Sequence, residues 1–191
     1  MKRFLLVFCL MIAVTAFAAA QESGEDPEFS DNFVYKVNQK GDQLIKINLI
    51  LNFPVLPKNL KIGGSGSLGY SYYFSDAFSV GGDASFSYSK TTGNNIFLFV
   101  PLTLKAGWQF SAGKFEFPLA LSVGVAAQNY LDRSYWGLIV RPELGAYYRY
   151  SQDWSFGVQT GVSVLPQWYS NSEYNKTGCI ISAELSARYH F

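Results

Sequence analysis

The sequence is poor in the residues that build disulfides, metal sites and membrane helices. It contains two cysteines and one histidine in 191 residues. Cys9 falls inside an apolar N-terminal run, so Cys179 has no second cysteine in the rest of the chain with which to form a disulfide. Cys179 and His190 occupy opposite faces of one predicted strand, which disfavours a zinc site. No later segment approaches the roughly 18 apolar residues of a membrane helix.

Charged residues are also scarce. They make up 15% of the chain, less than the 17% contributed by aromatic residues, whereas about 25% is usual in a soluble domain. Too few charges therefore remain to solvate a large outer surface. The formal net charge is only +1, and this near balance predicts no polyanion-binding patch and no nucleic acid partner.

The N-terminus has the pattern of an export signal. Lys2 and Arg3 precede an apolar run over residues 4–14, and small residues at 18–20 fit a signal-peptidase cleavage site. We therefore expect residues 1–20 to be a signal peptide. Residues 21–41 begin with an acidic, turn-rich stretch and are expected to form a periplasmic lead-in to a single domain over residues 42–191.

Most of that domain alternates between apolar and polar residues, as strands with two different faces do. Eight such segments can be counted, and an even number suits a closed antiparallel barrel. They cover residues 43–53, 67–74, 78–90, 96–110, 115–126, 136–150, 154–164 and 178–191. Residues 64–69 match the G-x-G-x-x-G pattern, but a strand follows them instead of a helix, so a flexible loop is the better interpretation than a nucleotide site.

The distribution of aromatic residues indicates which face of the strands meets lipid. Tight turns near residues 75–77, 111–114 and 151–153 alternate with longer connections, and aromatic residues gather on the apolar face close to the tight turns. Between the two rims this face is aliphatic, which is typical of a membrane-spanning band with an interfacial girdle. The fold class that we predict is all-β, an eight-stranded antiparallel transmembrane β-barrel of the outer membrane. A lipocalin-like soluble barrel is a distant alternative.

Two segments carry a resemblance to known barrels. Residues 69–81, GYSYYFSDAFSVG, resemble a strand-turn-strand hairpin of small barrels related to OmpA, OmpX and OmpW, and the chain closes in Arg188-Tyr189-His190-Phe191. The layout is similar to a spirochaete group often compared with OmpW. This resemblance implies an outer-membrane barrel and, for OmpW relatives, uptake of small hydrophobic molecules. Tyr189 and Phe191 resemble the terminal signal read by the barrel-assembly machinery. Outer-membrane lipid is the other expected partner, and a monomer is expected.

Charges of both signs are predicted to line the lumen as a plug of ion pairs, because unpaired charges would be costly there. The residues are Lys46, Asp83, Lys105, Glu116, Glu143, Arg149, Glu184 and Arg188. The candidate pairs are Asp83 with Lys105, Glu116 with Arg149, and Glu184 with Lys46 across the closing seam. Eight strands leave room only for side chains, so a filled lumen is favoured over an ion or proton path.

Above this plug we expect an apolar vestibule that could hold a small hydrophobic ligand. Its predicted members are Ile50, Phe97, Phe99, Ile139 and Ile180. Pro101, Pro118 and Pro142 lie within three consecutive predicted strands, although a closed barrel has no edge where a missing N–H is harmless. A β-bulge at each proline is one interpretation. The other is a weakened wall between the fourth and sixth strands, with Pro101 and Pro142 marking a lateral opening into the bilayer.

Two functions therefore remain open. One is entry of small hydrophobic solutes through the vestibule with lateral exit. The other is a structural or surface-binding, adhesin-like barrel, supported by the aromatic and polar loop over residues 167–174. We expect no enzymatic activity and no cofactor, because His190 lies at the periplasmic end of the last strand, about 30 Å from the outer loops.

Overall fold

The computed structural model describes residues 38–130, 133–167 and 176–191. These residues belong to one compact unit, Phe33–Phe191. The predicted signal peptide, most of the predicted lead-in and the loop at 168–175 lie outside the described residues. The strands are β1 (Gln43–Leu56), β2 (Gly63–Tyr73), β3 (Phe78–Lys90), β4 (Ile96–Ala112), β5 (Phe115–Tyr130), β6 (Arg133–Arg149), β7 (Trp154–Gln167) and β8 (Lys176–His190). Across these ranges no helix is long and apolar enough to cross a membrane.

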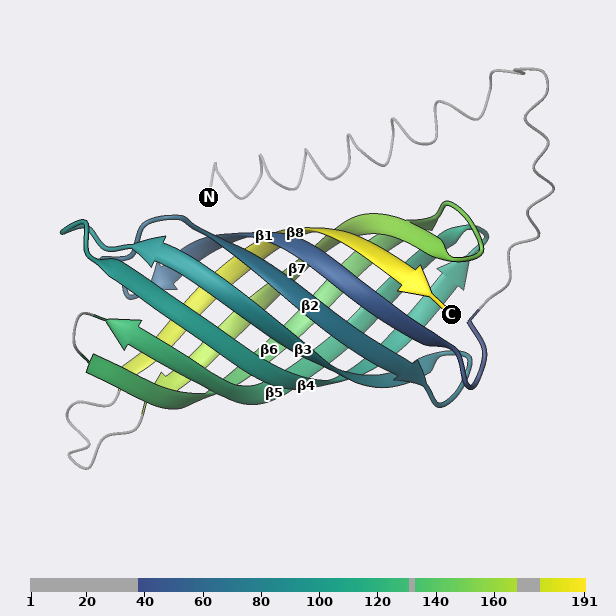
Figure 1. The fold of residues 1–191 in the computed structure, drawn as a ribbon, viewed down its shortest axis with the longest axis horizontal. Helices are drawn as coiled ribbons and strands as arrows, with labels where there is room; N and C mark the ends of the chain where they lie inside the picture. The colour runs from purple at the N-terminus through teal and green to yellow at the C-terminus, as the bar shows by residue number, and fades with distance from the viewer. Residues whose placement is uncertain (1–37, 131–132, 168–175) are drawn as a thin grey trace, which may run out of the picture. The chain divides into compact units, whose positions relative to one another are not determined.

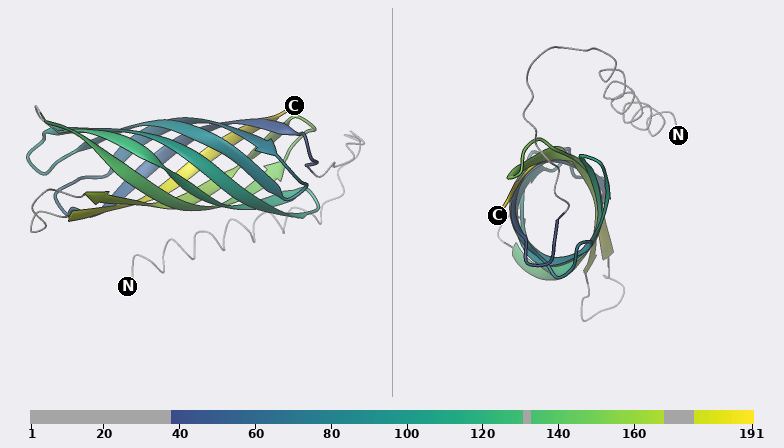
Figure 2. Two further views of the ribbon diagram at one scale, coloured as in Figure 1. Left: turned by 90° about the horizontal axis from the view of Figure 1, so that it is seen from below. Right: turned by 90° about the vertical axis from the view of Figure 1, so that its right-hand side faces the viewer.

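The eight strands form a closed antiparallel barrel in which each strand pairs with the next and β8 returns to β1 (Figure 1). The ring closes when seen along its axis (Figure 2, right). At the seam, Gln43 N donates to Phe191 O and Phe191 N donates to Gln43 O, each at 3.0 Å. The predicted fold class is confirmed.

Side chains alternate strictly between the lumen and the outer surface along most strands. In β1, Lys46 is 5% exposed and Asn48 is buried beside it, whereas Ile47 and Leu49 are 58% and 68% exposed on the opposite face. Exposing such an aliphatic surface to water is unfavourable, whereas contact with the hydrocarbon of a bilayer is not. The closed ring also leaves no unpaired strand edge in the hydrocarbon. The outer face is therefore the lipid-facing side.

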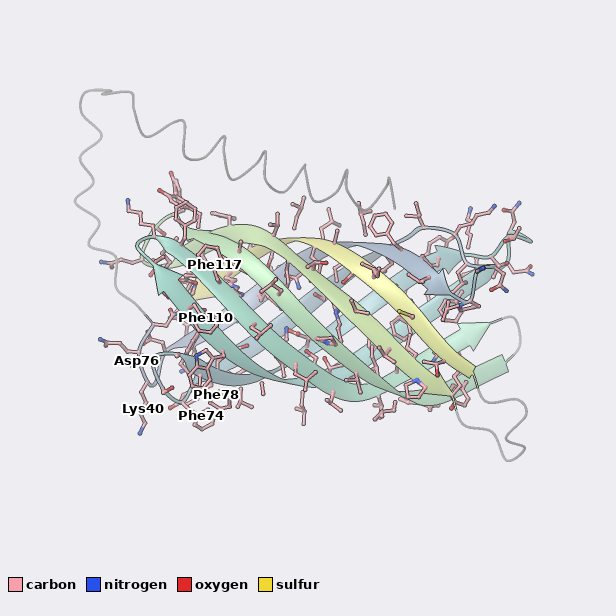
Figure 3. The ribbon with its side chains drawn as sticks, turned by 180° about the vertical axis from the view of Figure 1, so that it is seen from behind. Lys40, Phe74, Asp76, Phe78, Phe110 and Phe117 are labelled. Carbon is pink, nitrogen blue, oxygen red and sulfur yellow. The ribbon has the colours of Figure 1, made fainter. Side chains whose placement is uncertain are left out.

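Aromatic side chains form a girdle at one end of this lipid-facing surface. Phe74, Phe78, Phe110 and Phe117 lie at the same end as Asp76 in the β2–β3 turn (Figure 3). Neighbouring strands contribute rings that meet, with centroids 5.4 Å apart for Phe115 and Tyr148, and 5.1 Å apart for Trp154 and Tyr189. We call this end, which carries the turns at 74–77, 113–114 and 150–153, the short-turn rim, and the opposite end the long-loop rim.

The strands extend further toward the long-loop rim than their sequence predicts. β2 begins at Gly63, so the segment interpreted as a flexible glycine loop is paired strand, with Gly64 opposite Leu51 and Gly66 opposite Leu49. Gly63 permits close approach, because a Cβ there would clash with the Tyr88 carbonyl oxygen. β5 and β6 likewise extend to Tyr130 and from Arg133, through most of a stretch expected to be loop.

The end of the predicted lead-in is attached to the barrel. Gly41 N donates to Tyr73 O, and Tyr73 N donates to Asp42 O, each at 2.9 Å. Asn38 is fully buried, and its side-chain oxygen accepts a hydrogen bond of 3.1 Å from Arg149 Nη1. Residues 38–42 therefore belong to the closure of the short-turn rim.

Candidate functional site

The centre of the lumen holds a network of ion pairs, which we call the central ion network: Lys46, Asp83, Lys105, Arg141, Glu143 and Glu184. Lys105 contacts Asp83 and lies 2.7 Å from Glu143 Oε2. Lys46 joins less tightly, with its Nζ 3.7 Å from Asp83 and 4.0 Å from Glu143. Lys46 also donates to Gln159 Oε1 at 3.4 Å, and the Gln159 amide donates to Glu143. Through Gln159 these members of the network on β1, β3, β4 and β6 are also joined to β7.

Arg141 extends the central ion network to β8. Its guanidinium contacts Glu184 and lies 3.4 Å from Glu143. Glu184 also accepts hydrogen bonds from Ser182 Oγ at 3.0 Å and Asn48 Nδ2 at 3.1 Å. Charge-assisted hydrogen bonds of this kind offset the cost of burying the carboxylate.

A second set of charges, the lower ion layer, lies nearer the short-turn rim and consists of Glu116, Arg149 and Arg188. Glu116 is fully buried, 3.1 Å from Arg149 Nη1 and 3.6 Å from Arg188 Nη1. The Arg188 guanidinium lies 3.2 Å from the centroid of the Tyr147 ring, a cation–π arrangement that stabilises a desolvated cation.

Beside the lower ion layer, a serine and a histidine lie within hydrogen-bonding distance of each other. Ser155 Oγ lies 2.9 Å from His190 Nε2. Arg149 Nη1 lies 2.7 Å from the other ring nitrogen, Nδ1, and 2.8 Å from Nε2 itself. A catalytic serine requires access to substrate and a histidine oriented by an acceptor such as a carboxylate, whereas Ser155 is fully buried and the histidine faces a cation. The geometry of Ser155 and His190 therefore does not match that of a catalytic serine–histidine pair.

Two of the three ion pairs expected from the sequence are present, and the third is wrong. Asp83 pairs with Lys105 and Glu116 with Arg149. Glu184 pairs with Arg141 in place of Lys46, because Glu184 is opposite Ile50 in the β1–β8 register and Lys46 is opposite Arg188. Lys46 therefore lies four residues, about 13 Å, along β1 from the level of Glu184. Arg141 was missed, although alternation places it on the same face as Ile139 and Glu143.

The expected vestibule residues are mostly brought together, but as a packed cluster. Phe99, Ile139 and Ile180 are buried with Ala126 and Leu165, and Phe97 packs against them. Ile139 and Ala126 are fully buried. Ile50 is buried elsewhere, beside Ser65 and Glu184 in the strand register. Leu165 was missed because its position was expected to start a loop, whereas β7 continues to Gln167.

The prolines interrupt strand pairing without producing β-bulges, so that interpretation is wrong. At Pro101, β3 and β4 pair at Ala84–Leu102 and again at Ser87–Phe99 in the same register. Equivalent two-residue gaps occur between β5 and β6 at Pro118, and between β6 and β7 at Pro142. Each proline lacks the backbone N–H that would donate to a carbonyl of the adjacent strand, and the ladder of hydrogen bonds resumes beyond the proline. Pairing between β4 and β5 is continuous from Phe97 to Ala112, so the gaps do not fall on one wall between the fourth and sixth strands.

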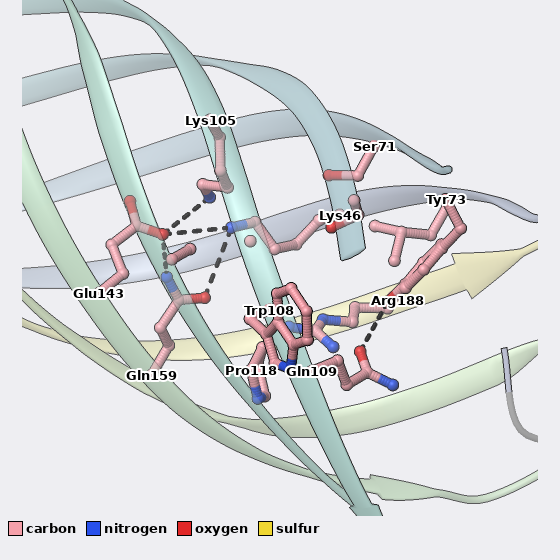
Figure 4. A pocket seen from close by; sticks show the side chains of 14 residues that line it. Lys46, Ser71, Tyr73, Lys105, Trp108, Gln109, Pro118, Glu143, Gln159 and Arg188 are labelled. Carbon is pink, nitrogen blue, oxygen red and sulfur yellow. Dashed lines mark hydrogen bonds and ion pairs between the residues drawn. The ribbon is translucent and has the colours of Figure 1, made fainter. Parts of the chain in front are cut away.

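A small cavity lies between the central ion network and the lower ion layer (Figure 4). Its volume is about 40 Å³, and its lining includes Lys46, Lys105, Gln109, Glu143 and Arg188. In the parts of the chain that the structure describes, no group of three or more His, Cys, Asp or Glu residues is placed to hold a metal ion.

Several solved barrels of outer-membrane proteins share this fold. Neisserial surface protein A superposes with a TM-score of 0.55 at 11% identity, covering 80% of this chain and 96% of that one. OprG from Pseudomonas aeruginosa gives 0.52 at 14% identity, covering 81% and 97%. Ail, the attachment invasion locus protein of Yersinia pestis, gives 0.50 at 14% identity, covering 80% and 100%. These likenesses concern the fold alone.

Sequence comparison supplies the family. A protein-family model matches residues 23–189. An uncharacterised protein of Treponema pallidum (strain Nichols) is 32% identical over 176 residues, covering 82% of this chain and 80% of that protein. The chain belongs to the same family as this Treponema pallidum protein. A second Treponema pallidum protein is 27% identical over 141 residues, and the match spans 48% of its length.

Proposed function

We propose that this outer-membrane barrel is a closed, non-conducting protein that acts as a structural or surface-binding element through its long-loop rim. The observation that carries the proposal is the central ion network, which joins charged side chains of β1, β3, β4, β6 and β8 across the lumen within 4.0 Å. An ion path would need continuous hydrated space, whereas the cavity beside the central ion network measures about 40 Å³. A barrel of eight strands has an interior that side chains can fill.

Conductance in planar lipid bilayers tests the closed lumen. The refolded wild-type barrel is expected to give no steady ohmic current. A double variant, Lys105→Ala with Glu143→Ala, removes two side chains from the middle of the network while keeping the charge balance, and it should fold and show a measurable leak. A large, stable conductance from the wild-type protein would overturn the proposal.

The surface-binding part depends on the long-loop rim. Deleting residues 168–174, which lie outside the described strands, should leave a folded barrel by heat-modifiable gel migration and lower the attachment of cells carrying it to immobilised host or envelope components. Unchanged attachment would leave a purely structural role.

One observation favours a second candidate, entry of a small hydrophobic solute with lateral exit. The pairing gap at Pro101 opens beside Phe99, a member of the apolar cluster at the long-loop end. A solute that displaced this cluster would meet a wall with fewer backbone hydrogen bonds. Diffraction from crystals soaked in a hydrophobic probe distinguishes the candidates, because density among Phe99, Ile139 and Ile180 would favour entry.

A further inference from the structure

The inward-facing charges of the described strands do not balance. The cations are Lys46, Lys105, Arg141, Arg149 and Arg188, and the carboxylates are Asp83, Glu116, Glu143 and Glu184. Every one of these carboxylates already contacts at least one cation. With histidine neutral and every lysine and arginine protonated, the cations outnumber the carboxylates by one inside a wall surrounded by lipid. An uncompensated charge is among the most unfavourable groups that a low-dielectric interior can hold.

The cavity between the two charged layers is where this surplus is concentrated. Its lining carries three cations, Lys46, Lys105 and Arg188, and one carboxylate, Glu143. Glu143 lies on the side where Lys46, Lys105 and Gln159 converge (Figure 4). The charged side chains that line the remaining space therefore favour an anion over a cation.

Two buried side chains that line the cavity carry unused hydrogen-bond donors. Gln109 is 6% exposed, and its Oε1 accepts from Tyr73 OH at 2.6 Å, while its Nε2 has no hydrogen-bond partner among the described residues. Arg188 is 5% exposed, and its Nε and Nη1 likewise lack a hydrogen-bond partner there. Buried donors without acceptors are rare in native proteins, and a bound water or ion is one of the explanations for them.

We propose that this cavity binds one small monovalent anion of the size of chloride. Gln109 Nε2 and the Arg188 guanidinium would donate hydrogen bonds to it, and its charge would neutralise the surplus cation. A volume of about 40 Å³ accommodates a monatomic ion or a few waters, since a cavity needs only about 10–15 Å³ to hold one water. The inference goes beyond the proposed function, because it holds whether the long-loop rim binds a surface partner or admits a solute.

Bromide replaces chloride and can be located by its anomalous scattering, so it is the probe. The wild-type barrel is refolded and crystallised in sodium bromide, and diffraction is recorded at the bromine absorption edge. A single anomalous peak is expected within hydrogen-bonding distance of Gln109 Nε2 and Arg188. Density for waters alone, with no anomalous peak, would overturn the proposal.

Two variants balance the lumen in opposite ways and should both abolish the peak. Gln109→Glu supplies a carboxylate of nearly the same shape at the edge of the cavity, and Lys46→Gln removes the most loosely paired cation. Lys58→Gln makes the same charge change on an exposed loop and should keep the peak. A bromide peak that persists in both luminal variants would identify an adventitious ion only.

A stability measurement keeps the test valid if a luminal variant crystallises poorly. Unfolding in urea is compared in sodium bromide and in sodium gluconate at equal ionic strength, after refolding in each salt. Above the dissociation constant, each tenfold rise in bromide should raise the folding equilibrium constant of the wild type and of Lys58→Gln roughly tenfold. Gln109→Glu should show no such dependence, and equal stability of the wild type in both salts would contradict the proposal.

Discussion

Glu116 shows at the scale of one residue how the lumen of this barrel is stabilised. Its side chain is fully buried and is the carboxylate nearest to both Arg149 and Arg188. Breaking a buried pair by removing one partner is far more costly than never having made the pair, because the remaining charge stays in the interior. Glu116 therefore determines whether two guanidinium groups are tolerated in the lower ion layer.

We predict that Glu116→Gln lowers the free energy of unfolding by about 3–5 kcal/mol, since it keeps the shape of the side chain and removes only the charge. The measurement is urea unfolding of the barrel in lipid vesicles, followed by tryptophan fluorescence. Asp76→Asn, in an exposed turn, is the matched control and should change stability by less than about 0.5 kcal/mol. Equal effects of the two substitutions would show that Glu116 is not paired in the folded barrel.

Individual residues also show which parts of the site could be read from sequence. Alternation assigned Lys46, Asp83 and Glu184 to the luminal face, because the period of two can be read within a single strand without knowing which strands pair with it. It did not give their depth, which depends on the stagger between strands, so Glu184 was assigned to Lys46 when Arg141 is its partner. Arg141 was visible in the same pattern, and Asn38 was not, because no periodic segment contains it.

At the scale of one strand, the prolines are the informative feature. β4 continues through Pro101, and its pairing with β5 is unbroken while its pairing with β3 skips two positions. A strand can therefore lose ladder bonds on one side and stay in register through the other. The strand boundaries were predictable to within about four residues, and the stretches expected to be loop that are strand include Gly63 and Gly64 as well as the end of β5. Glycine content suggests a loop at Gly63, whereas in the folded barrel the close approach of the Tyr88 carbonyl explains why a residue without Cβ is needed in the strand.

We predict that Pro101→Val restores backbone hydrogen bonding between β3 and β4 and slows amide exchange in the paired residues at least tenfold. The structural reason is that valine supplies the N–H missing from the ladder and fits a strand without strain. Hydrogen–deuterium exchange read by mass spectrometry over residues 84–87 gives the result. Pro142→Val is the control, because its gap lies between β6 and β7 and should leave exchange in β3 unchanged.

The whole molecule has two different ends, and this asymmetry fixes how it should sit in the outer membrane. The short-turn rim carries the dense aromatic girdle and the residues 38–42 that close it. The long-loop rim carries the connection between Leu56 and Gly63, where Leu60 pairs with Thr91 of the next hairpin. Strand number, closure and this asymmetry were all predictable from sequence, because they follow from counting alternating segments and turns.

We predict that the long-loop rim faces outward from the cell. In a Cys179→Ser background, a membrane-impermeant maleimide should label Asn59→Cys on intact cells, and it should label Asp76→Cys only after the outer membrane is permeabilised. Both positions are exposed and lie at opposite rims. Labelling of Asp76→Cys on intact cells would reverse the assigned orientation.

The β1–β8 seam has a consequence for how quickly the barrel can form. Seven of the eight strand pairings join neighbours in the chain, whereas the seam brings Leu44 against His190. Bringing such distant segments together carries the largest loop-closure entropy of any pairing, and non-local contacts are the slow ones in folding. Closure should therefore be the last kinetic event. Until it happens, β1 and β8 both present open edges, and a folding intermediate with seven completed pairings should be the species most prone to aggregate.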